Sequence, residues 1–151
     1  MALLILAGCG FQLQGALTVP PEIERTYIAA DDRHSQFYRE LRSALGTAGV
    51  DVVDSAADAT ATLTIAYDAT DQRVLSVSAR NVPTEYEVYY TIRYSLDSGE
   101  ENLLGMQTLT LTRDYTYVST LVLGKGREEE LLREAIVDDL VRIVLKQIST
   151  L

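Results

Sequence analysis

The sequence predicts an α+β fold: a mixed, mainly antiparallel β-sheet with two α-helices packed on one face. The first observation is a strict alternation of apolar and polar residues over residues 85–96. The second is a pair of stretches, residues 35–48 and 127–149, in which apolar residues recur every three or four positions. The third is the grouping of strand-like segments between these two helices, which is typical of a sheet with helices on one side.

Residues 85–96, EYEVYYTIRYSL, are expected to form a strand in the middle of the sheet. Side chains of a strand point alternately to its two faces, so the apolar residues at even positions would line one buried face. Aromatic and β-branched residues favour strands, and neither Gly nor Pro interrupts the run. The segments on both sides also have strand character, which favours a central, antiparallel position.

The N-terminal part of the domain is expected to supply one strand and one helix. Residues 26–30 are a short strand candidate. Asp31 or Asp32 is the expected N-cap of the helix over residues 35–48. Gly49 suits the left-handed conformation that ends many helices.

The remaining strands are predicted from alternation and from turn residues. Residues 50–53 are a second short strand, and residues 61–79 a long strand with a bulge or twist near its polar middle. Residues 80–83, RNVP, predict a hairpin turn, because Asn tolerates turn conformations. Residues 97–100 predict another turn, with a glycine where φ is positive, before a last strand over residues 103–117.

The C-terminal part is predicted to be a loop over residues 118–126 followed by the helix over residues 127–149. The apolar positions of this helix repeat at helical spacing: Leu132, Ile136, Leu140, Ile143, Val144 and Ile148. Three glutamates at positions 128–130 would lie in its first turn, with basic residues near its end, which is the order that the helix dipole favours.

Length and composition limit the class of protein. A chain of 151 residues is expected to form one domain and can bury enough surface to fold without a disulfide or a metal. A net charge of −9 without any basic run argues against nucleic-acid binding. One Cys and one His allow no internal disulfide and leave few ligands for a metal site. We therefore expect no metal and no cofactor.

No catalytic motif is found in the chain. A phosphate-binding glycine loop, GxSxG and HExxH are all absent from the sequence. The single His34 has no flanking support for catalysis and is expected to be solvated or to cap the helix. Glu85 and Glu87 share a strand face, as glycosidase carboxylates can, but without a predicted cleft we expect both to be solvated. The chain is therefore not expected to be an enzyme.

Two basic residues are conspicuous in this acidic chain. Arg80 lies in the predicted hairpin turn, and Lys125 lies between two glycines just before the C-terminal helix. Exposed guanidinium and ammonium groups can pair with phosphates, and Arg can do so with two parallel bonds. Taken alone, each is more simply explained as a solvated turn charge.

The N-terminus carries a candidate lipidation motif. Residues 1–8, MALLILAG, are apolar, and Leu6-Ala7-Gly8-Cys9 resembles a bacterial lipobox, in which the Cys is lipidated and becomes the mature N-terminus. No basic residue precedes Cys9, so only the end of a signal peptide is expected here. The alternative is a short buried terminus with an incidental Cys. We divide the chain into a residual signal segment, residues 1–8, and a single domain, residues 9–151.

Several stretches occur together in a specific order and spacing. They are Cys9-Gly10-Phe11 with Leu13 nearby, then FYRELRSALGTAGVDVV, RVLSVSARNVPTEYEV, RDYTY and LGKGREEELLREAI. In this order the chain resembles the LptE family of lipopolysaccharide (LPS)-assembly lipoproteins. The resemblance covers essentially the whole mature chain, and the fold it implies agrees with the fold predicted above.

The resemblance implies a non-enzymatic lipoprotein, anchored through lipidated Cys9 in the inner leaflet of the cell outer membrane and facing the periplasm. It implies that the chain plugs the LPS-export β-barrel LptD with one-to-one stoichiometry, supports its assembly and binds LPS during transport to the surface. The family's LPS-binding basic positions correspond to Arg80 and Lys125. Position 10, directly after Cys9, is Gly and not the Asp that would favour retention in the inner membrane.

A different class of function is left open: a lipoprotein that only mediates protein interactions and binds no lipid. LPS is polyanionic, so a chain of charge −9 should repel it at long range. Binding would therefore have to be local, at Arg80 and Lys125, or need the barrel. Screening over about 10 Å at physiological salt permits such a local site.

Overall fold

The structure, a computed structural model, describes residues 19–116 and 122–151, and residues 122–125 by their backbone alone. The motif at Cys9 lies outside the described residues. In chain order the described elements are the 3-10 helix η1 (Pro21–Ile23), β1 (Arg25–Ala30), α1 (Gln36–Thr47), β2 (Asp51–Val53), the 3-10 helix η2 (Ala56–Asp58), β3 (Ala61–Val77), β4 (Pro83–Ser98), β5 (Glu101–Thr116) and α2 (Val122–Ile148).

The strands form one sheet in the order β2-β1-β3-β4-β5. β1 is parallel to both β2 and β3, whereas β3, β4 and β5 form an antiparallel meander. The prediction of a mixed, mainly antiparallel sheet is confirmed. β4 is an interior strand, as expected, but the middle position belongs to β3, because the N-terminal β1 pairs with the free edge of β3. β5 forms one edge of the sheet and pairs, among the described strands, with β4 alone.

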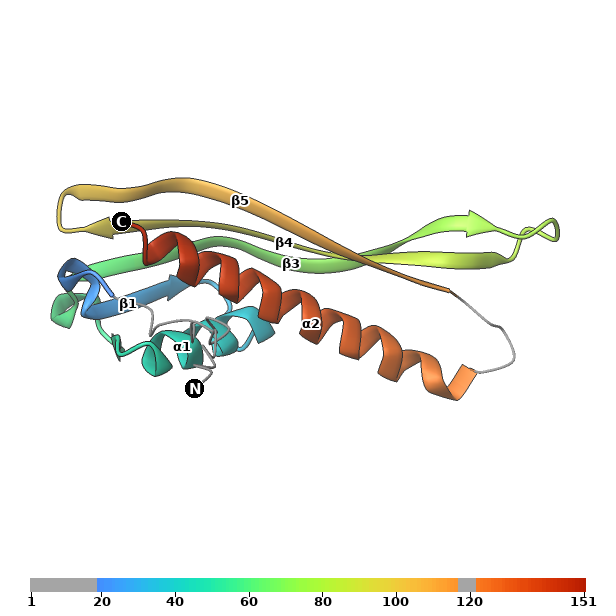
Figure 1. Ribbon diagram of the computed structural model, residues 1–151, viewed down its shortest axis with the longest axis horizontal. Coiled ribbons are helices and arrows are strands. Elements are labelled where there is room, and N and C mark those ends of the chain that lie inside the picture. Colours follow the sequence, from blue (N-terminus) through green and yellow to red (C-terminus); the bar gives the residue numbers. More distant parts are fainter. Residues whose placement is uncertain (1–18, 117–121) are drawn as a thin grey trace, which may run out of the picture.

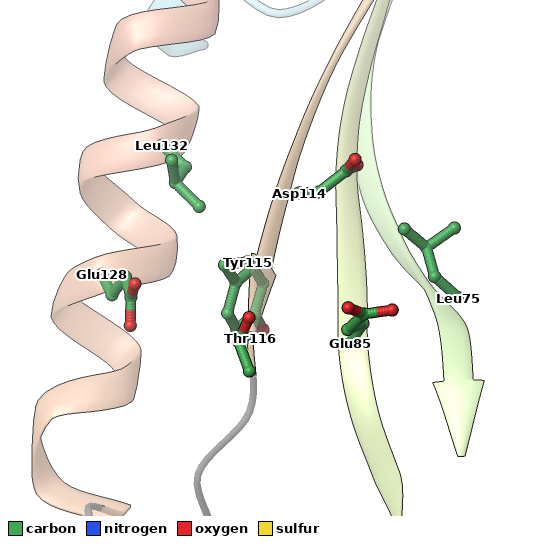
Figure 2. Close-up of a pocket in the computed structure, with 7 residues that line it drawn as sticks. All are labelled: Leu75, Glu85, Asp114, Tyr115, Thr116, Glu128 and Leu132. Carbon is green, nitrogen blue, oxygen red and sulfur yellow. The ribbon is translucent and has the colours of Figure 1, made fainter.

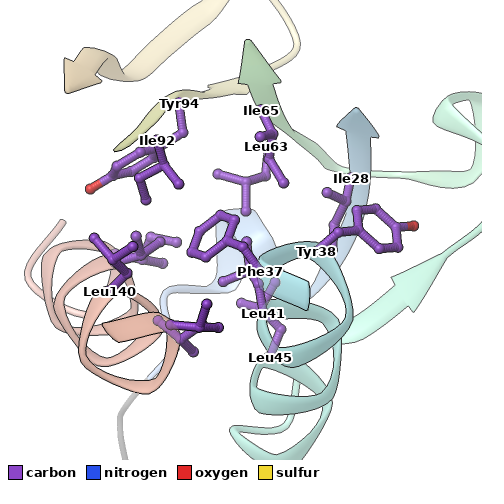
Figure 3. Packing of buried hydrophobic residues seen from close by; sticks show 14 of the residues in the cluster. Ile28, Phe37, Tyr38, Leu41, Leu45, Leu63, Ile65, Ile92, Tyr94 and Leu140 are labelled. Atoms are coloured by element: carbon purple, nitrogen blue, oxygen red, sulfur yellow. The ribbon is translucent and has the colours of Figure 1, made fainter. Parts of the chain in front are cut away.

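Both helices cover the same face of the sheet, which confirms the predicted layer arrangement (Figure 1). The core lies between them and the sheet (Figure 3). α1 contributes Phe37, Tyr38, Leu41 and Leu45. α2 contributes Ile136, Val137, Leu140, Val141, Val144 and Ile148. The sheet contributes mainly Ile28, Leu63, Ile65, Val88, Tyr90, Ile92, Tyr94 and Leu96.

The alternation predicted for β4 is confirmed, since its even-numbered residues from Val88 to Leu96 are buried against the helices. The predicted irregularity in β3 is a register shift between Ile65 and Tyr67. Gly49 has φ +93° and Gly99 has φ +59°, so both occupy the left-handed region in which a side chain would be strained.

The N-cap of α1 differs from the prediction. Ser35 caps the helix, and its Oγ accepts a hydrogen bond of 3.0 Å from the backbone N–H of Tyr38. Asp32 instead accepts a bond of 2.7 Å from the backbone N–H of His34 in the preceding turn. The two aspartates lie too far before the first helical residue, Gln36, to reach the free amides of the helix.

The start of α2 also differs. The loop predicted over residues 118–126 is wrong from Val122 onward, because the helix begins there. Glu128, Glu129 and Glu130 therefore do not lie in the first turn, which has no acidic residue. Each glycine lowers helix stability by only about 1 kcal/mol relative to alanine. Gly124 and Gly126 therefore do not prevent helix formation here, because α2 is packed into the core from Ile136 onward.

The far half of the β3–β4 hairpin extends beyond the core. The buried core residues of β3 end at Ile65, and those of β4 begin at Val88. We call residues 74–84, the two strand ends and the connecting turn, the hairpin tip. In Figure 1 the hairpin tip projects at one end of the long axis, at the same end of the molecule as the beginning of α2.

Candidate functional site

The structure places the two predicted basic positions at one end of the molecule. Arg80 lies in the turn of the hairpin tip and is exposed. Lys125 lies in the first turn of α2, not in a loop, and its side chain is outside the described part of the chain. The hairpin tip and the beginning of α2 are both found at the far end of the long axis (Figure 1).

The hairpin turn is fixed by several hydrogen bonds. The backbone N–H of Ser78 donates to the carbonyl of Val82 at 2.8 Å, and that of Asn81 donates to the carbonyl of Ser78 at 2.9 Å. Asn81 has φ +58°, a left-handed conformation that Asn adopts more readily than most residues. The turn therefore holds Arg80 in a defined position, with its side chain accessible to solvent.

The hairpin tip contains no carboxylate. Between Asp71 and Glu85 the only charged residues are Arg73 and Arg80. Arg73 is already neutralised, because its Nη2 lies 2.5 Å from Oε2 of Glu87. Among the described residues Arg80 has no salt-bridge partner, so this guanidinium is available to an external anion.

The two carboxylates of β4, those of Glu85 and Glu87, are not both exposed to solvent. Glu85 is exposed and accepts a hydrogen bond of 2.8 Å from the Ser76 hydroxyl. The side chain of Glu87 is only 12% exposed, and it faces Arg73 directly across the β3–β4 ladder. Opposite charges at such directly paired positions attract one another, which explains why the expectation for Glu87 was wrong.

An open groove of about 400 Å³ lies beside the hairpin tip, between α2 and the sheet (Figure 2). It is lined by Leu75, Glu85, Asp114, Tyr115, Thr116, Glu128 and Leu132. Burial raises the pKa of the Tyr115 phenol, and Glu129, Tyr86 and Glu128 raise it further. The negative charge that opposes ionisation of this phenol would also oppose a bound phosphate, so the groove is unsuited to an anionic headgroup.

A polar network holds α2 against the hairpin behind the tip. Arg133 donates from Nη1 to the Thr70 hydroxyl at 2.6 Å and pairs through Nη2 with Glu129 at 2.5 Å. Arg113 of β5 pairs with Asp139 of α2. These contacts fix α2 relative to the sheet on the side that leads to the tip.

A second polar cluster lies nearer the core. Asp68 accepts hydrogen bonds from the Tyr90 hydroxyl at 2.6 Å and from the Ser35 hydroxyl at 2.5 Å. Burial and this bond to Asp68 raise the pKa of Tyr90 well above its ordinary value. Ser35 is the N-cap of α1, Asp68 lies in β3 and Tyr90 lies in β4, so this cluster connects the helix to both strands.

Comparison with known proteins identifies the family. The chain matches the family described as LptE, lipopolysaccharide-assembly, over residues 23–148, which is most of its length. The chain belongs to the LptE family. The predicted resemblance is therefore confirmed.

Relatives and solved structures agree with this assignment. The chain is 25% identical over 150 residues to the LPS-assembly lipoprotein LptE of Yersinia enterocolitica, covering 98% of this chain and 72% of the relative. It is 24% identical to the LptE of Yersinia pestis, with 99% and 72% covered. Its fold is similar to the NMR structure of an uncharacterised lipoprotein B from Nitrosomonas europaea, with TM-score 0.78, 28% identity, and 93% and 91% of the two chains covered.

A crystal structure of the rare lipoprotein B from Shewanella oneidensis shares the fold as well. Its TM-score is 0.72 at 22% identity, with 83% of this chain and 94% of that chain covered. The two solved structures therefore share the fold over most of this chain.

The structure adds one basic residue that the sequence reasoning missed in this LptE-family chain. Arg127 follows Lys125 by two positions in α2, is exposed, and has no salt-bridge partner among the described residues. The signal in the sequence was GKGR, but Arg127 was interpreted as the first residue of the helix and not as part of a basic segment.

Two negative findings apply to the described part of the chain. No group of three or more His, Cys, Asp or Glu side chains there is arranged to hold a metal ion. None of the described helices combines the length and the apolar character needed to cross a membrane.

Proposed function

We propose that this LptE-family chain is a non-enzymatic lipoprotein of the outer membrane, anchored on the periplasmic side through a lipid on Cys9. It plugs the LPS-export β-barrel LptD, supports the assembly of this barrel, and binds LPS during transport to the cell surface. The family match over residues 23–148 supports this role, as do relatives named LPS-assembly lipoprotein.

The observation that carries the LPS-binding part is the guanidinium of Arg80, which has no salt-bridge partner among the described residues and lies on a hairpin tip without carboxylates. Phosphates of LPS would pair with Arg80 and with Lys125, which lies at the same end of the molecule (Figure 1). The net charge of −9 opposes long-range attraction, but a contact at this end acts within the screening length of about 10 Å.

The test is the double variant Arg80→Asp/Lys125→Asp. Each replacement removes a charge-assisted contact and introduces a repulsive carboxylate, so we expect LPS affinity to fall by about a hundredfold. Co-purification with the barrel should be unaffected. The matched control is Arg39→Asp/Lys146→Asp, which makes the same charge change at two exposed positions elsewhere on the helices.

Unchanged LPS binding by the double variant would show that Arg80 and Lys125 are the wrong residues. An equal loss in the control variant would mean that only net charge matters. Co-purification with LptD at one-to-one stoichiometry is a separate requirement, and a chain that purifies alone contradicts the plug.

The alternative function is a protein-interaction module that binds no lipid. The sheet face opposite the helices favours it, because no described element covers that face. Tyr67 there is exposed beneath the guanidinium of Arg93, and the hydroxyls of Thr91 and Thr110 lie 2.9 Å apart. For this alternative the wild-type chain would co-purify with the barrel and show no affinity for purified LPS.

A further inference from the structure

Exposed apolar side chains are concentrated on the hairpin tip. Val74, Leu75, Val77 and Val82 are 44–53% exposed. The other large hydrophobic residues exposed in the described part of the chain are dispersed over β3, β5, α2 and the C-terminus: Tyr67, Met106, Leu131 and Leu151. Single exposed apolar residues are ordinary, whereas a cluster indicates a contact surface.

The core of the domain does not account for this cluster. On β4 the buried residues begin at Val88, and the strand continues five residues farther to Pro83, which is about 17 Å. No described helix reaches over the turn, and the hairpin tip is an extremity of the molecule (Figure 1). No part of the chain that the structure describes therefore keeps these side chains from water.

The charge pattern indicates what covers them. Arg80 lies between Val77 and Val82, and no carboxylate interrupts residues 72–84 of a chain with net charge −9. A surface with one free cation among apolar side chains is complementary to an amphiphile with an anionic headgroup and acyl chains. The acidic groove beside the tip disfavours the headgroup, which would instead pair with Arg80 on the tip.

We propose that the hairpin tip contacts the acyl chains of LPS through Val74, Leu75, Val77 and Val82, while Arg80 pairs with a phosphate of the same molecule. This inference rests on the proposed LPS-binding function and adds to it a hydrophobic part of the site.

The test uses the variant Val77→Ser/Val82→Ser, which keeps Arg80, and two probes: purified LPS and the same LPS with its acyl chains removed and its phosphates intact. We expect the affinity for LPS to fall about ten- to thirtyfold and the affinity for deacylated LPS to stay the same. Arg80→Asp should weaken binding to both probes.

The matched control is Met106→Ser/Leu151→Ser, which removes two similarly exposed apolar side chains outside the hairpin tip. It should bind both probes like the wild type. Far-UV circular dichroism and the urea midpoint of both variants should match the wild type, since neither touches the core.

Five results would overturn the inference. In the first, the Val77→Ser/Val82→Ser variant would bind LPS as tightly as the wild type. In the second, its affinity would fall by the same factor for LPS and for deacylated LPS. In the third, the variant would keep LPS binding but no longer co-purify with the barrel, which would assign the hairpin tip to a protein contact. In the fourth, the wild type would bind LPS-free phosphatidylethanolamine–phosphatidylglycerol vesicles as tightly as it binds LPS, and the valine variant would lose this binding. If the wild type binds neither LPS probe, the proposed LPS-binding function fails as well.

Discussion

Two buried tyrosines of β4 combine core packing with a hydrogen bond. Tyr94 is fully buried and donates its hydroxyl hydrogen to Oε1 of Gln147 on α2. Tyr90 donates to Asp68. Burial raises the pKa of Tyr94 to about 12, and burial together with Asp68 raises the pKa of Tyr90 above its ordinary value of 10. Both phenols therefore stay protonated in the folded protein at a pH where the unfolded chain has begun to ionise.

This difference predicts a loss of stability in alkali. Above about pH 10 the unfolded state binds fewer protons at these phenols than the folded state, so the free energy of unfolding decreases as pH rises towards 12. The slope is at most about 1.4 kcal/mol per pH unit for each tyrosine. Urea unfolding between pH 8 and 11 measures it, and the chain has only two lysines that titrate in this range.

The control for this pH dependence is Tyr94→Phe, which removes one of the two phenols. Its free energy of unfolding should decrease less steeply above pH 10 than that of the wild type. Identical slopes for the two chains would mean that Tyr94 ionises equally easily in the folded and unfolded states.

The sequence predicts the conformation of single residues well where it depends on local backbone geometry. Gly49, Gly99 and the turn at Arg80 were correctly placed, because positive φ and turn chemistry are local properties. The pairing of Glu87 with Arg73 was not predictable. It depends on the register of β3 against β4, which shifts between Ile65 and Tyr67 and again beyond Val74.

At the scale of the secondary-structure element, Ser35 is the residue that most clearly controls a helix end. It caps α1 and also donates a hydrogen bond to Asp68 of β3. We expect Ser35→Ala to lower the free energy of unfolding by about 1–2 kcal/mol, because both a cap and a partly buried hydrogen bond are lost. Urea unfolding at neutral pH provides the measurement.

The comparison variant for the cap is Ser43→Ala, an exposed position within the same helix. Alanine has the higher helix propensity, so this variant should be neutral or slightly more stable than the wild type. An equal effect of the two substitutions would contradict a capping role for Ser35.

The predicted ends of the elements were least accurate where capping residues or glycines allow more than one start. Aspartates before α1 suggested a cap that Ser35 provides, and glycines before residue 127 suggested a loop where α2 has already begun. Apolar periodicity located most of the buried part of each helix, because burial against the sheet requires it, but on α2 it missed Val137 and Val141.

At the scale of the whole molecule, the domain consists of a packed half and a distal half. Ile92, Tyr94 and Leu96 of β4 belong to the buried core, while the hairpin from residue 74 to 86 lies outside it. We expect amide hydrogen exchange to be slowest in the packed half and much faster in the distal hairpin, because opening the hairpin exposes little apolar surface. Exchange followed by NMR or mass spectrometry tests this, and equal protection in both halves would indicate one cooperative unit.

The fold class could be predicted from the sequence because strand and helix periods differ and are regular over long segments here. The order of the strands could not. β1 pairs with β3 in parallel orientation across thirty residues of intervening chain, and nothing in the local pattern of residues 25–30 indicates that partner. For the same reason, nothing in the local sequence pattern indicates that the hairpin tip and the start of α2 lie at the same end of the molecule (Figure 1).

The outer edge of β5, which no other described strand covers, has a consequence for handling the isolated protein. This strand is sixteen residues long, contains no proline, and alternates leucine with threonine over residues 108–112. A long edge of this kind offers unsatisfied amides and carbonyls to any other extended chain, including a second copy of itself. Concentrated alone, the protein is therefore at risk of edge-to-edge aggregation, and a lysine placed at Thr110 should improve its solubility without altering either helix.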